Sequence, residues 1–478
     1  MMSFVGLVLA AGLGKRMKSS LPKALHQVAG QPMIDHVVGT LAKSGASRVI
    51  TVVGHEGQAL QEHLAGRSEI VWQHEQLGTG HAAAQAGPAL AGYVGNVVII
   101  PGDVPLLPAS SIQNLIEVHE AGGYAATVLT MVLDEPGVYG RVVRDCSGRV
   151  SSIVEYCDAS DAIRAVREVN TGVYCFDNHQ LAGALPLLSN ENKQGEYYLT
   201  DVISALISQD LPVGAVALDD ASEGMGVNSR AQLAAAEQAM RDRKRLALME
   251  EGVTLVDPAS TFVDAQVEIG RDTVIMPFTV ISGSTSIGQS CNIGPYVQIR
   301  DSSVGDRCNI GPFAFLRPGT VLGDRVKVGD FVEVKNSRVG EGTKVPHLSY
   351  IGDAVLGSGV NVGAGTITCN YDGVAKHTTV IDNGAFVGAN SNLVAPVRVG
   401  QNAYIATGST VTTNVPPEAL AIARARQENK DGWAARRRAA LAAGTSGTGR
   451  TAEAGGTAGT AGTAGDFKAA EDAREEKK

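Results

Sequence analysis

Aromatic residues are scarce in this chain. They make up 5% of its 478 residues, whereas glycine occurs 57 times. Few rings and many glycines favour a repetitive architecture with tight turns, or a segment of low complexity. The hydrophobic content of 44% is ordinary for a globular protein, so the chain can still fill a large core. The length predicts two or three domains.

Basic residues are not in excess. The chain has 40 Lys and Arg residues against 49 Asp and Glu residues, which gives a net charge of -9. A general nucleic-acid-binding protein needs a basic surface, so we expect no nucleic-acid partner. Local clusters of cations that hold phosphate groups remain compatible with this balance.

Paired cysteines and long apolar runs are also missing. The six cysteines form no CxxC pair, so we predict neither a zinc site nor a redox motif, and we expect reduced thiols and a cytoplasmic location. The apolar start, Phe4–Ala11, is too short to span a bilayer and has no basic segment before it. We therefore expect a buried first strand and no membrane partner.

Residues 1–228 alternate short apolar runs with helix-like stretches. Near-continuous apolar strands separated by helices are typical of a mainly parallel sheet covered on both faces. The sequence therefore predicts an α/β domain here. The expected strands are Phe4–Leu9, Arg48–Val53, Glu69–Gln73 and Val97–Ile100, and the expected helices include Pro32–Ser44 and Ser110–Ala121.

Residues 229–252 predict one long helix that connects two domains. They are rich in Ala, Leu, Glu and Arg, which are good helix formers, and Gly252 provides a natural stop. At the far end, residues 437–478 predict a disordered low-complexity tail. Its Gly, Thr and Ala residues cannot bury enough apolar surface to offset the entropy of ordering.

A six-residue repeat of aliphatic side chains begins at Val263 and continues, with one-residue slips, to Val411. Glycine often follows the aliphatic residue, as in Ile269-Gly270. A period of six fits neither a helix nor a coiled coil, but it fits a triangular solenoid with one strand per six residues. Residues 253–436 therefore predict a β-helix.

The repeat is interrupted twice, at Val345–Tyr350 and at Thr368–Thr379. Departures from a regular repeat are common places for function. Hexapeptide repeats of this kind resemble the left-handed parallel β-helix of acyltransferases.

Small residues and cations follow the first predicted strand. Leu9-Ala10-Ala11-Gly12 leads to Gly14, Arg16 and Lys23, with spacings that match neither a Walker A loop nor GxGxxG. Small residues let backbone N–H groups approach a nucleotide, and Arg16 and Lys23 would supply positive charge for a triphosphate. The alternative is a tight strand–helix turn with two surface cations.

Asp103 follows the predicted strand Val97–Ile100. Ligands bind at the carboxyl ends of the strands in open α/β sheets, and Mg²⁺ prefers few carboxylates completed by substrate phosphates. Asp103 is therefore a candidate Mg²⁺ ligand. The alternative is a loop or capping aspartate.

These motifs, with others in the same order, resemble the family of bifunctional N-acetylglucosamine-1-phosphate uridylyltransferases and glucosamine-1-phosphate acetyltransferases. The resemblance covers residues 4 to about 436. It implies a Rossmann-like nucleotidyltransferase domain and a left-handed β-helix, with acetyl-CoA and UTP as co-substrates and Mg²⁺ as cofactor. The further motifs are Gln76–Gly80, Tyr139-Gly140-Arg141, Asn170-Thr171-Gly172, Gly195–Tyr198 and Gly226-Val227-Asn228.

The resemblance also implies roles for residues of the α/β domain. Arg16 and Lys23 would stabilise phosphate charge during catalysis, and Asp103 and Asn228 would bind Mg²⁺. For Asn228, an N-cap of the connecting helix is the alternative. Uridine nucleotide would contact Leu9, Ala10, Ala11, Gly12, Gln73, Gly78 and Thr79, and the sugar would contact Gly140, Glu155 and Asn170.

A lone histidine is more often structural than catalytic, but the neighbours of His347 match the acetyltransferase domain of the same family. The resemblance makes His347 the general base. An amine must lose a proton before it attacks a thioester, and imidazole titrates near neutrality. The sugar phosphate would contact Arg317 and Lys335, the sugar Tyr350, Asn361 and Asn370, and acetyl-CoA Ala364, Tyr371, Ala389, Thr407 and Arg424.

The chain departs from the family pattern at three positions. Pro101 stands where some relatives carry tyrosine, and Ala389 and Thr407 stand where some carry serine and alanine. The family forms homotrimers with acetyl sites between neighbouring β-helices, which makes Thr368–Thr379 the expected cross-subunit arm. Two other hypotheses stay open: a nucleotidyltransferase whose β-helix only drives oligomerisation, and an assembly subunit without catalysis.

Overall fold

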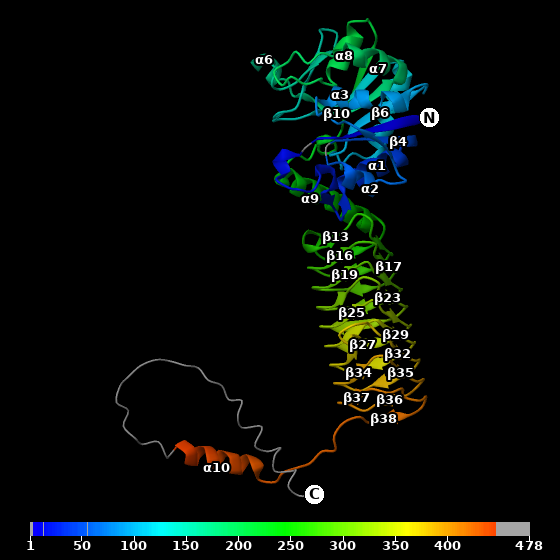
Figure 1. Cartoon of the computed structure of the whole chain (residues 1–478), viewed down its shortest axis with the longest axis vertical. Coiled ribbons are helices and arrows are strands. Elements are labelled where there is room, and N and C mark those ends of the chain that lie inside the picture. The colour runs from blue at the N-terminus through cyan, green and yellow to red at the C-terminus, as the bar shows by residue number, and fades with distance from the viewer. Residues whose placement is uncertain (1–2, 13, 55, 446–478) are drawn as a thin grey trace, which may run out of the picture. The chain divides into compact units, whose positions relative to one another are not determined.

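The structure is a computed structural model that describes residues 3–12, 14–54 and 56–445 (Figure 1). It contains two compact units, residues 1–423 and residues 424–478. The first unit holds both the α/β domain and the solenoid, and each is described in turn. None of the described helices is long and apolar enough to cross a membrane.

The α/β domain is built on a sheet whose first four strands are parallel. Their order is β6-β1-β4-β5, and they match the four predicted strands to within two residues at each end. Alternate residues of β1 pack into two separate apolar clusters, so the sheet is buried on both faces, as predicted. The strands are β1 (Phe4–Ala10), β4 (Ala46–Val53), β5 (Glu69–Trp72) and β6 (Asn96–Pro101).

The remaining strands make the sheet mixed. β10 (Glu168–Asp177) runs antiparallel between β6 and β7 (Ala126–Val132), while β11 (Val213–Ala217) is parallel to β7. The hairpin of β8 (Arg141–Arg144) and β9 (Val150–Val154) attaches to β10. The mainly parallel α/β class is confirmed, with the antiparallel strand β10 inserted and an antiparallel hairpin attached to it.

Helices cover both faces of this sheet. On one face the apolar cluster includes residues of α1 (Met33–Lys43), α2 (Gln58–His63) and α5 (Ala109–Gly122), of which α1 and α5 were predicted. On the other face it includes residues of four helices: α3 (Thr79–Gln85), α4 (Gly87–Leu90), α7 (Asn178–Ala184) and α8 (Asp201–Ile207).

The predicted connecting helix is α9 (Arg230–Glu250). Its N-cap is Ser229, whose side chain accepts a hydrogen bond from the Gln232 N–H. The alternative role of Asn228 as the N-cap is therefore wrong. Ala236 packs in a small cluster of the α/β domain, and Leu248 packs in the solenoid core, so α9 contributes to both.

The solenoid has three parallel sheets of 10, 9 and 8 strands, each strand pairing with its equivalent one turn later. Most strands have two or three residues, from β12 (Thr254–Leu255) to β38 (Leu420–Ala421). The aliphatic residues of the six-residue repeat are all buried in one core cluster. The predicted β-helix of hexapeptide repeats is confirmed.

The two predicted interruptions are smaller than expected. The chain continues through Val345–Tyr350 in β27 (Lys344–His347) and β28 (Tyr350–Gly352), so the first interruption is wrong. Thr368 is fully buried in β31 (Ile367–Cys369). Its hydroxyl accepts a hydrogen bond from the Gly352 N–H at 2.8 Å and donates one to the Gly352 carbonyl at 3.1 Å. A threonine whose hydroxyl is satisfied can thus replace an aliphatic residue, and only residues 370–378 leave the solenoid.

One corner of the solenoid carries a column of exposed aromatic rings. Phe278, Tyr296, Phe313 and Phe331 stack with centroid distances of 4.9, 5.0 and 5.2 Å. Each lies one turn after the previous one. Phe331 directly follows Asp330, so the column leads to the turn that carries the second candidate site.

The solenoid ends earlier than predicted, because β38 is its last strand and the second unit begins at residue 424. The second unit contains α10 (Trp433–Thr445), which crosses the domain boundary expected at residues 436 and 437. Alanine, arginine and leucine dominate this segment and favour a helix. The rest of the expected tail, residues 446–478, lies outside the described residues.

Candidate active sites

A cleft of about 690 Å³ opens at the carboxyl ends of β1, β5 and β6. This is the edge at which parallel strands deliver loop residues to ligands. Every residue predicted for the first site lines the cleft: Leu9, Ala10, Ala11, Gly12, Arg16, Lys23, Gln73, Gly78, Thr79, Asp103, Gly140, Glu155, Asn170 and Asn228.

The cationic side of the cleft centres on Lys23. Its ammonium contacts the Asp103 carboxylate and donates to the Asn228 side-chain oxygen at 3.0 Å. Gly14 makes this approach possible, since its φ is +59° and a Cβ there would lie 2.9 Å from the Lys23 Cβ. The two predicted metal ligands therefore converge on one positive charge.

These two oxygen donors fit Mg²⁺. One carboxylate and one amide oxygen are ligands of the kind that Mg²⁺ takes when phosphates and water complete its shell. No group of three or more His, Cys, Asp or Glu side chains among the described residues could hold a metal ion. The donor set is thus suited to an ion that arrives with phosphate.

The opposite side of the cleft carries the residues that are predicted to contact a sugar. The Asn170 N–H donates to the Gly140 carbonyl at 2.9 Å, which joins β10 to the loop before β8. Glu155 accepts from the Thr200 hydroxyl at 3.2 Å. Burial raises the pKa of the Glu155 carboxyl, and the Thr200 hydrogen bond partly opposes this shift.

The side of the cleft that is predicted to hold the nucleotide is shaped by hydrogen bonds between side chains and the backbone. Gln73 is 2% exposed and donates to the Gly78 carbonyl at 3.1 Å. Gly78 has φ +109°, and a Cβ there would lie 2.5 Å from the Tyr197 carbonyl oxygen, so no other residue fits. Thr79 accepts from the Leu199 N–H at 3.0 Å. Hydrogen bonds therefore tie the start of α3 to Gln73 and Leu199.

Two residues of the Tyr139-Gly140-Arg141 motif have roles that the sequence did not reveal. Tyr139 lines the cleft, and burial raises the pKa of its hydroxyl beside the charges of Asp103 and Arg16. Arg141 is 2% exposed and donates to the backbone carbonyls of residues 137, 139 and 164. Arg141 therefore shapes the loop and does not face the cleft.

The second candidate site lies on one face of the solenoid. Arg317 follows β22 (Phe315–Leu316), Lys335 ends β25 (Glu333–Lys335), and Tyr350 begins β28. These strands are neighbours in one sheet, and Lys335 pairs with Gly352 in register. Asn370 follows β31, the next strand of the same sheet.

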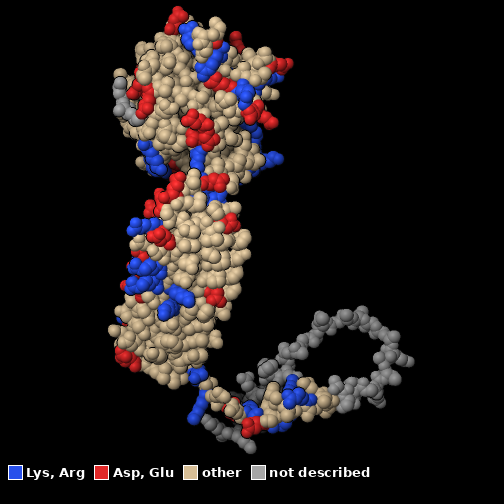
Figure 2. All heavy atoms as spheres, turned by 180° about the vertical axis from the view of Figure 1, so that it is seen from behind, with Lys and Arg blue, Asp and Glu red and all other residues tan. Residues whose placement is uncertain are grey.

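Cations gather at this site. Arg317 donates to Glu333 at 2.7 Å, and the Lys335 ammonium lies 3.5 Å from Asp353. Lys376 was not predicted, but it lies beside Lys335, whose hydrogen bond and positive charge lower the pKa of the Lys376 ammonium. Figure 2, which views the molecule from behind, shows Lys and Arg side chains gathered along one edge of the solenoid.

His347 ends β27 at a corner of the solenoid and hydrogen-bonds Asp330 through Nδ1. The two residues pair in register, one turn apart. This hydrogen bond lowers the pKa of the Asp330 carboxyl. A carboxylate only accepts hydrogen bonds, so the neutral imidazole carries its proton on Nδ1 and leaves Nε2 as an acceptor.

Residues 6–169 match the MobA-like NTP transferase domain family. Residues 266–301 match the bacterial transferase hexapeptide (six repeats) family, and residues 302–329 and 378–413 match the hexapeptide repeat of succinyl-transferase. The chain is 50% identical to the bifunctional protein GlmU of Heliobacterium modesticaldum over 447 residues, which cover 90% of this chain and 98% of that protein. It is 51% identical to that of Carboxydothermus hydrogenoformans over 444 residues, with 90% and 99% covered.

The chain belongs to the GlmU family.

Three residues predicted for acetyl-CoA line one edge in this GlmU chain. The positions Asn361, Phe386 and Tyr404 pair with one another in register on three successive turns. Each of the three predicted residues follows its paired position by three residues, so Ala364, Ala389 and Thr407 stack on successive turns. His347 lies on the same edge, one turn before Ala364. Ala364 and Ala389 use backbone carbonyls to accept from the next turn, at 2.7 and 2.8 Å. An edge of small residues leaves room for an extended ligand along it.

Other residues predicted for the acetyl site lie apart. Asn361 is in β30 (Asn361–Val362), which belongs to a different face of the solenoid from Lys335 and Tyr350. Tyr371 projects from the 370–378 loop and is 61% exposed. Arg424 is exposed and is the first residue of the second unit.

The departure at Pro101 is accommodated in the cleft of this GlmU chain. Pro101 ends β6, and a Cβ on Gly172 would lie 3.0 Å from the proline ring. The next N–H, that of Gly102, donates to the Leu9 carbonyl at 2.9 Å, so the strand still ends in register.

Proposed function

We propose that this chain makes UDP-N-acetylglucosamine in two steps at two separate sites. The solenoid acetylates glucosamine-1-phosphate with acetyl-CoA, and the α/β domain then transfers uridylyl from UTP to N-acetylglucosamine-1-phosphate and releases pyrophosphate. The product supplies peptidoglycan and lipopolysaccharide-type precursors in the cytoplasm. The proposal depends most on one observation: the same chain has a cleft centred on Lys23 and an imidazole–carboxylate pair at His347.

Uridylyl transfer needs no protein nucleophile. A phosphate oxygen of the sugar phosphate attacks the α-phosphorus of UTP, and pyrophosphate leaves. Arg16 and Lys23 stabilise the charge that develops on the phosphates, while the cleft aligns the reacting groups. When bound, Mg²⁺ held by Asp103 and Asn228 supplies further positive charge there. Gly140, Glu155 and Asn170 orient the sugar, and Leu9, Ala10, Ala11, Gly12, Gln73, Gly78 and Thr79 hold the uridine nucleotide.

Acetyl transfer needs a free amine. His347 accepts a proton from the substrate amine at Nε2, the nitrogen attacks the thioester carbonyl, and the coenzyme A thiolate leaves and takes a proton. Asp330 orients the imidazole and stabilises its protonated form. Arg317, Lys335 and Lys376 bind the phosphate. Tyr350, Asn361 and Asn370 bind the sugar, and Ala364, Tyr371, Ala389, Thr407 and Arg424 contact acetyl-CoA.

The acetyl site is proposed to form between subunits of a homotrimer. Within one chain, Asn361 lies on a different face from Lys335, and His347 has a side chain that is 56% exposed. A flat solenoid face provides only one wall of a binding site. A neighbouring copy would provide the second wall, with the 370–378 loop as the cross-subunit arm.

The two other hypotheses predict different chemistry. A single-activity nucleotidyltransferase would not need the His347–Asp330 pair on its solenoid. An assembly subunit without catalysis would not need Lys23 between Asp103 and Asn228.

The proposal is tested by giving the purified protein glucosamine-1-phosphate, acetyl-CoA, UTP and Mg²⁺. Free thiol, pyrophosphate and UDP-N-acetylglucosamine are followed separately. Omission of acetyl-CoA should stop thiol and pyrophosphate release, and added N-acetylglucosamine-1-phosphate should restore pyrophosphate alone. Pyrophosphate release from glucosamine-1-phosphate without acetyl-CoA would contradict the proposed order of the two steps. If no free thiol were released under any condition, the single-activity nucleotidyltransferase would be the better explanation.

A further inference from the structure

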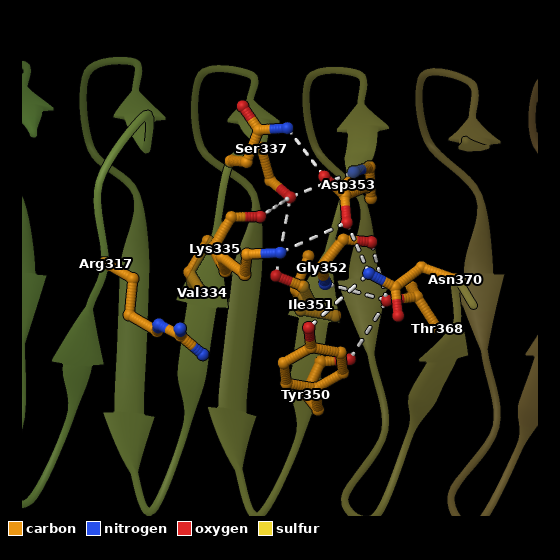
Figure 3. A network of polar contacts seen from close by, with 12 residues as sticks. Arg317, Val334, Lys335, Ser337, Tyr350, Ile351, Gly352, Asp353, Thr368 and Asn370 are labelled. Carbon is orange, nitrogen blue, oxygen red and sulfur yellow. Dashed lines mark hydrogen bonds and ion pairs between the residues drawn. The ribbon is translucent and has the colours of Figure 1, made fainter. Parts of the chain in front are cut away.

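A partly buried carboxylate, Asp353, lies behind the proposed sugar-phosphate site. It follows β28 at a corner of the solenoid, with φ +48° and a side chain that is 10% exposed. Figure 3 shows Asp353 with Lys335 on one side and Asn370 on the other, and the three side chains point toward one another. Asp353 has no role among the residues assigned above.

Both oxygens of this carboxylate are engaged. Oδ1 accepts from the Asn336 side-chain amide at 2.6 Å. Oδ2 lies 3.5 Å from the Lys335 ammonium and accepts from the Asn370 side-chain amide. Burial acts to raise the pKa of Asp353, but the hydrogen bonds from Asn336 and Asn370 and the charge of Lys335 lower it overall. Asp353 is therefore an anion that ties together three consecutive turns.

The backbone of the same residue holds its neighbours as well. The Asp353 N–H donates to the Lys335 carbonyl at 3.0 Å, and its carbonyl accepts from the Thr379 N–H at 3.3 Å. Asn370 begins the 370–378 loop and Thr379 follows its end. Asp353 thus contacts both ends of the loop that carries Tyr371 and Lys376.

We infer that Asp353 is a positioning residue for the glucosamine-1-phosphate site. It holds the Lys335 ammonium and the 370–378 loop so that Lys335 and Lys376 face the same phosphate. The inference rests on the proposed acetyltransferase function. Asp353 acts through these neighbours and does not touch the substrate.

Two explanations of this carboxylate predict opposite signs. If Asp353 contributed only its negative charge, it would repel the phosphate, and its neutralisation would strengthen binding. If Asp353 positions Lys335 and the loop, its neutralisation frees both and weakens binding. The sign of the change in KM for glucosamine-1-phosphate therefore distinguishes them.

The test is Asp353→Asn, with Asp301→Asn as the matched control. Asp301 has φ +44° at the equivalent corner, two turns before Asn336, and its backbone carbonyl accepts from the Gly319 N–H at 3.0 Å. Its carboxylate accepts from the Ser284 N–H at 2.9 Å and pairs with Arg300 at 3.3 Å, rather than with Lys335 and the 370–378 loop. For Asp353→Asn we expect KM for glucosamine-1-phosphate to rise about tenfold, as for a lost charge-assisted hydrogen bond. KM for acetyl-CoA and the uridylyl rate should not change, and Asp301→Asn should match the wild type throughout.

An unchanged or lower KM for glucosamine-1-phosphate in Asp353→Asn would overturn the inference. If the wild type released no thiol, the proposed acetyltransferase function would fail instead, so the two failures are distinguishable. If Asp353→Asn did not fold, Asn336→Ala would give the test, because it releases only one carboxylate oxygen. It should raise the same KM by a smaller factor, and an unchanged KM would again overturn the inference.

Discussion

At the scale of single residues, Lys23 is the centre of the α/β cleft. Its ammonium contacts one side-chain oxygen of Asp103 and one of Asn228, so these two oxygen atoms face the same place in the cleft. A residue in this place can bind phosphate and also keep the metal ligands together. The resemblance predicted Asp103 and Asn228 as joint metal ligands and Lys23 as a cation for phosphate. The contact of Lys23 with both is visible only in the structure, because the three residues are far apart in the chain.

Lys23→Met should remove positive charge while it keeps much of the side-chain volume. We expect the uridylyl rate to fall by about 10²–10³-fold, as when one preorganised donor is removed from a transition state. Pyrophosphate release measures this loss, and thiol release serves as the control. Uridylyl transfer at the wild-type rate would contradict the role of Lys23.

Glu155 predicts a pH-dependent effect on stability. Because burial raises its pKa in the folded state, the native protein must hold a disfavoured carboxylate as the pH rises above the unfolded value of about 4.3. Glu155→Gln should therefore raise the melting temperature, and by more at about pH 8 than at about pH 4.5. It should also weaken binding of N-acetylglucosamine-1-phosphate. A gain in stability that is largest in acid would contradict this account.

At the scale of elements, the six-residue period predicted the solenoid because each inward aliphatic residue occupies an equivalent place. The same pattern wrongly predicted that the solenoid is interrupted from Thr368. The Thr368 side chain faces the core as an aliphatic residue would, because its hydroxyl forms hydrogen bonds with the Gly352 backbone. It also missed Asp330, although Asp330 and His347 are one turn apart. Counting one whole turn of the solenoid back from His347 would have predicted Asp330 as its neighbour. Lys376 lies in the loop outside the repeat, so the period could not predict its position.

The 370–378 loop is the element with the clearest prediction. Thr368 and Thr379 are fully buried and should be kept, so the change is the replacement of residues 371–377 by a short Gly–Ser turn. We expect thiol release to fall about 100-fold or more, because Tyr371 and Lys376 are both lost. Pyrophosphate release from N-acetylglucosamine-1-phosphate should not change. Normal acetylation would show that the loop takes no part in the site.

At the scale of the whole molecule, the α/β domain and the solenoid carry separate sets of functional residues. The sequence predicted both folds, while the exact end of the solenoid and the helix α10 were missed. Apart from Trp433 and Leu441 the apolar residues of the missed helix are alanines, so no periodic pattern marks it. Only its helix-forming composition could have indicated it.

Residues 446–478 should be dispensable for both reactions. They are mostly Gly, Thr, Ala and charged residues, which cannot form a core. Truncation after Thr445 should leave the rates of thiol and pyrophosphate release within about twofold of the wild type. A large loss of either rate would show that this segment contributes to a site.

The central claim is that one chain carries two independent chemistries, and one paired assay tests it most directly. Asp103→Ala and His347→Ala are compared with the wild type, with thiol and pyrophosphate release measured on the same samples. Asp103→Ala should lose pyrophosphate release from N-acetylglucosamine-1-phosphate and keep acetylation. His347→Ala should lower acetylation by about 10²–10⁴-fold and keep uridylyl transfer. If either variant lost both activities while folded, or kept the activity it is expected to lose, the account would be contradicted.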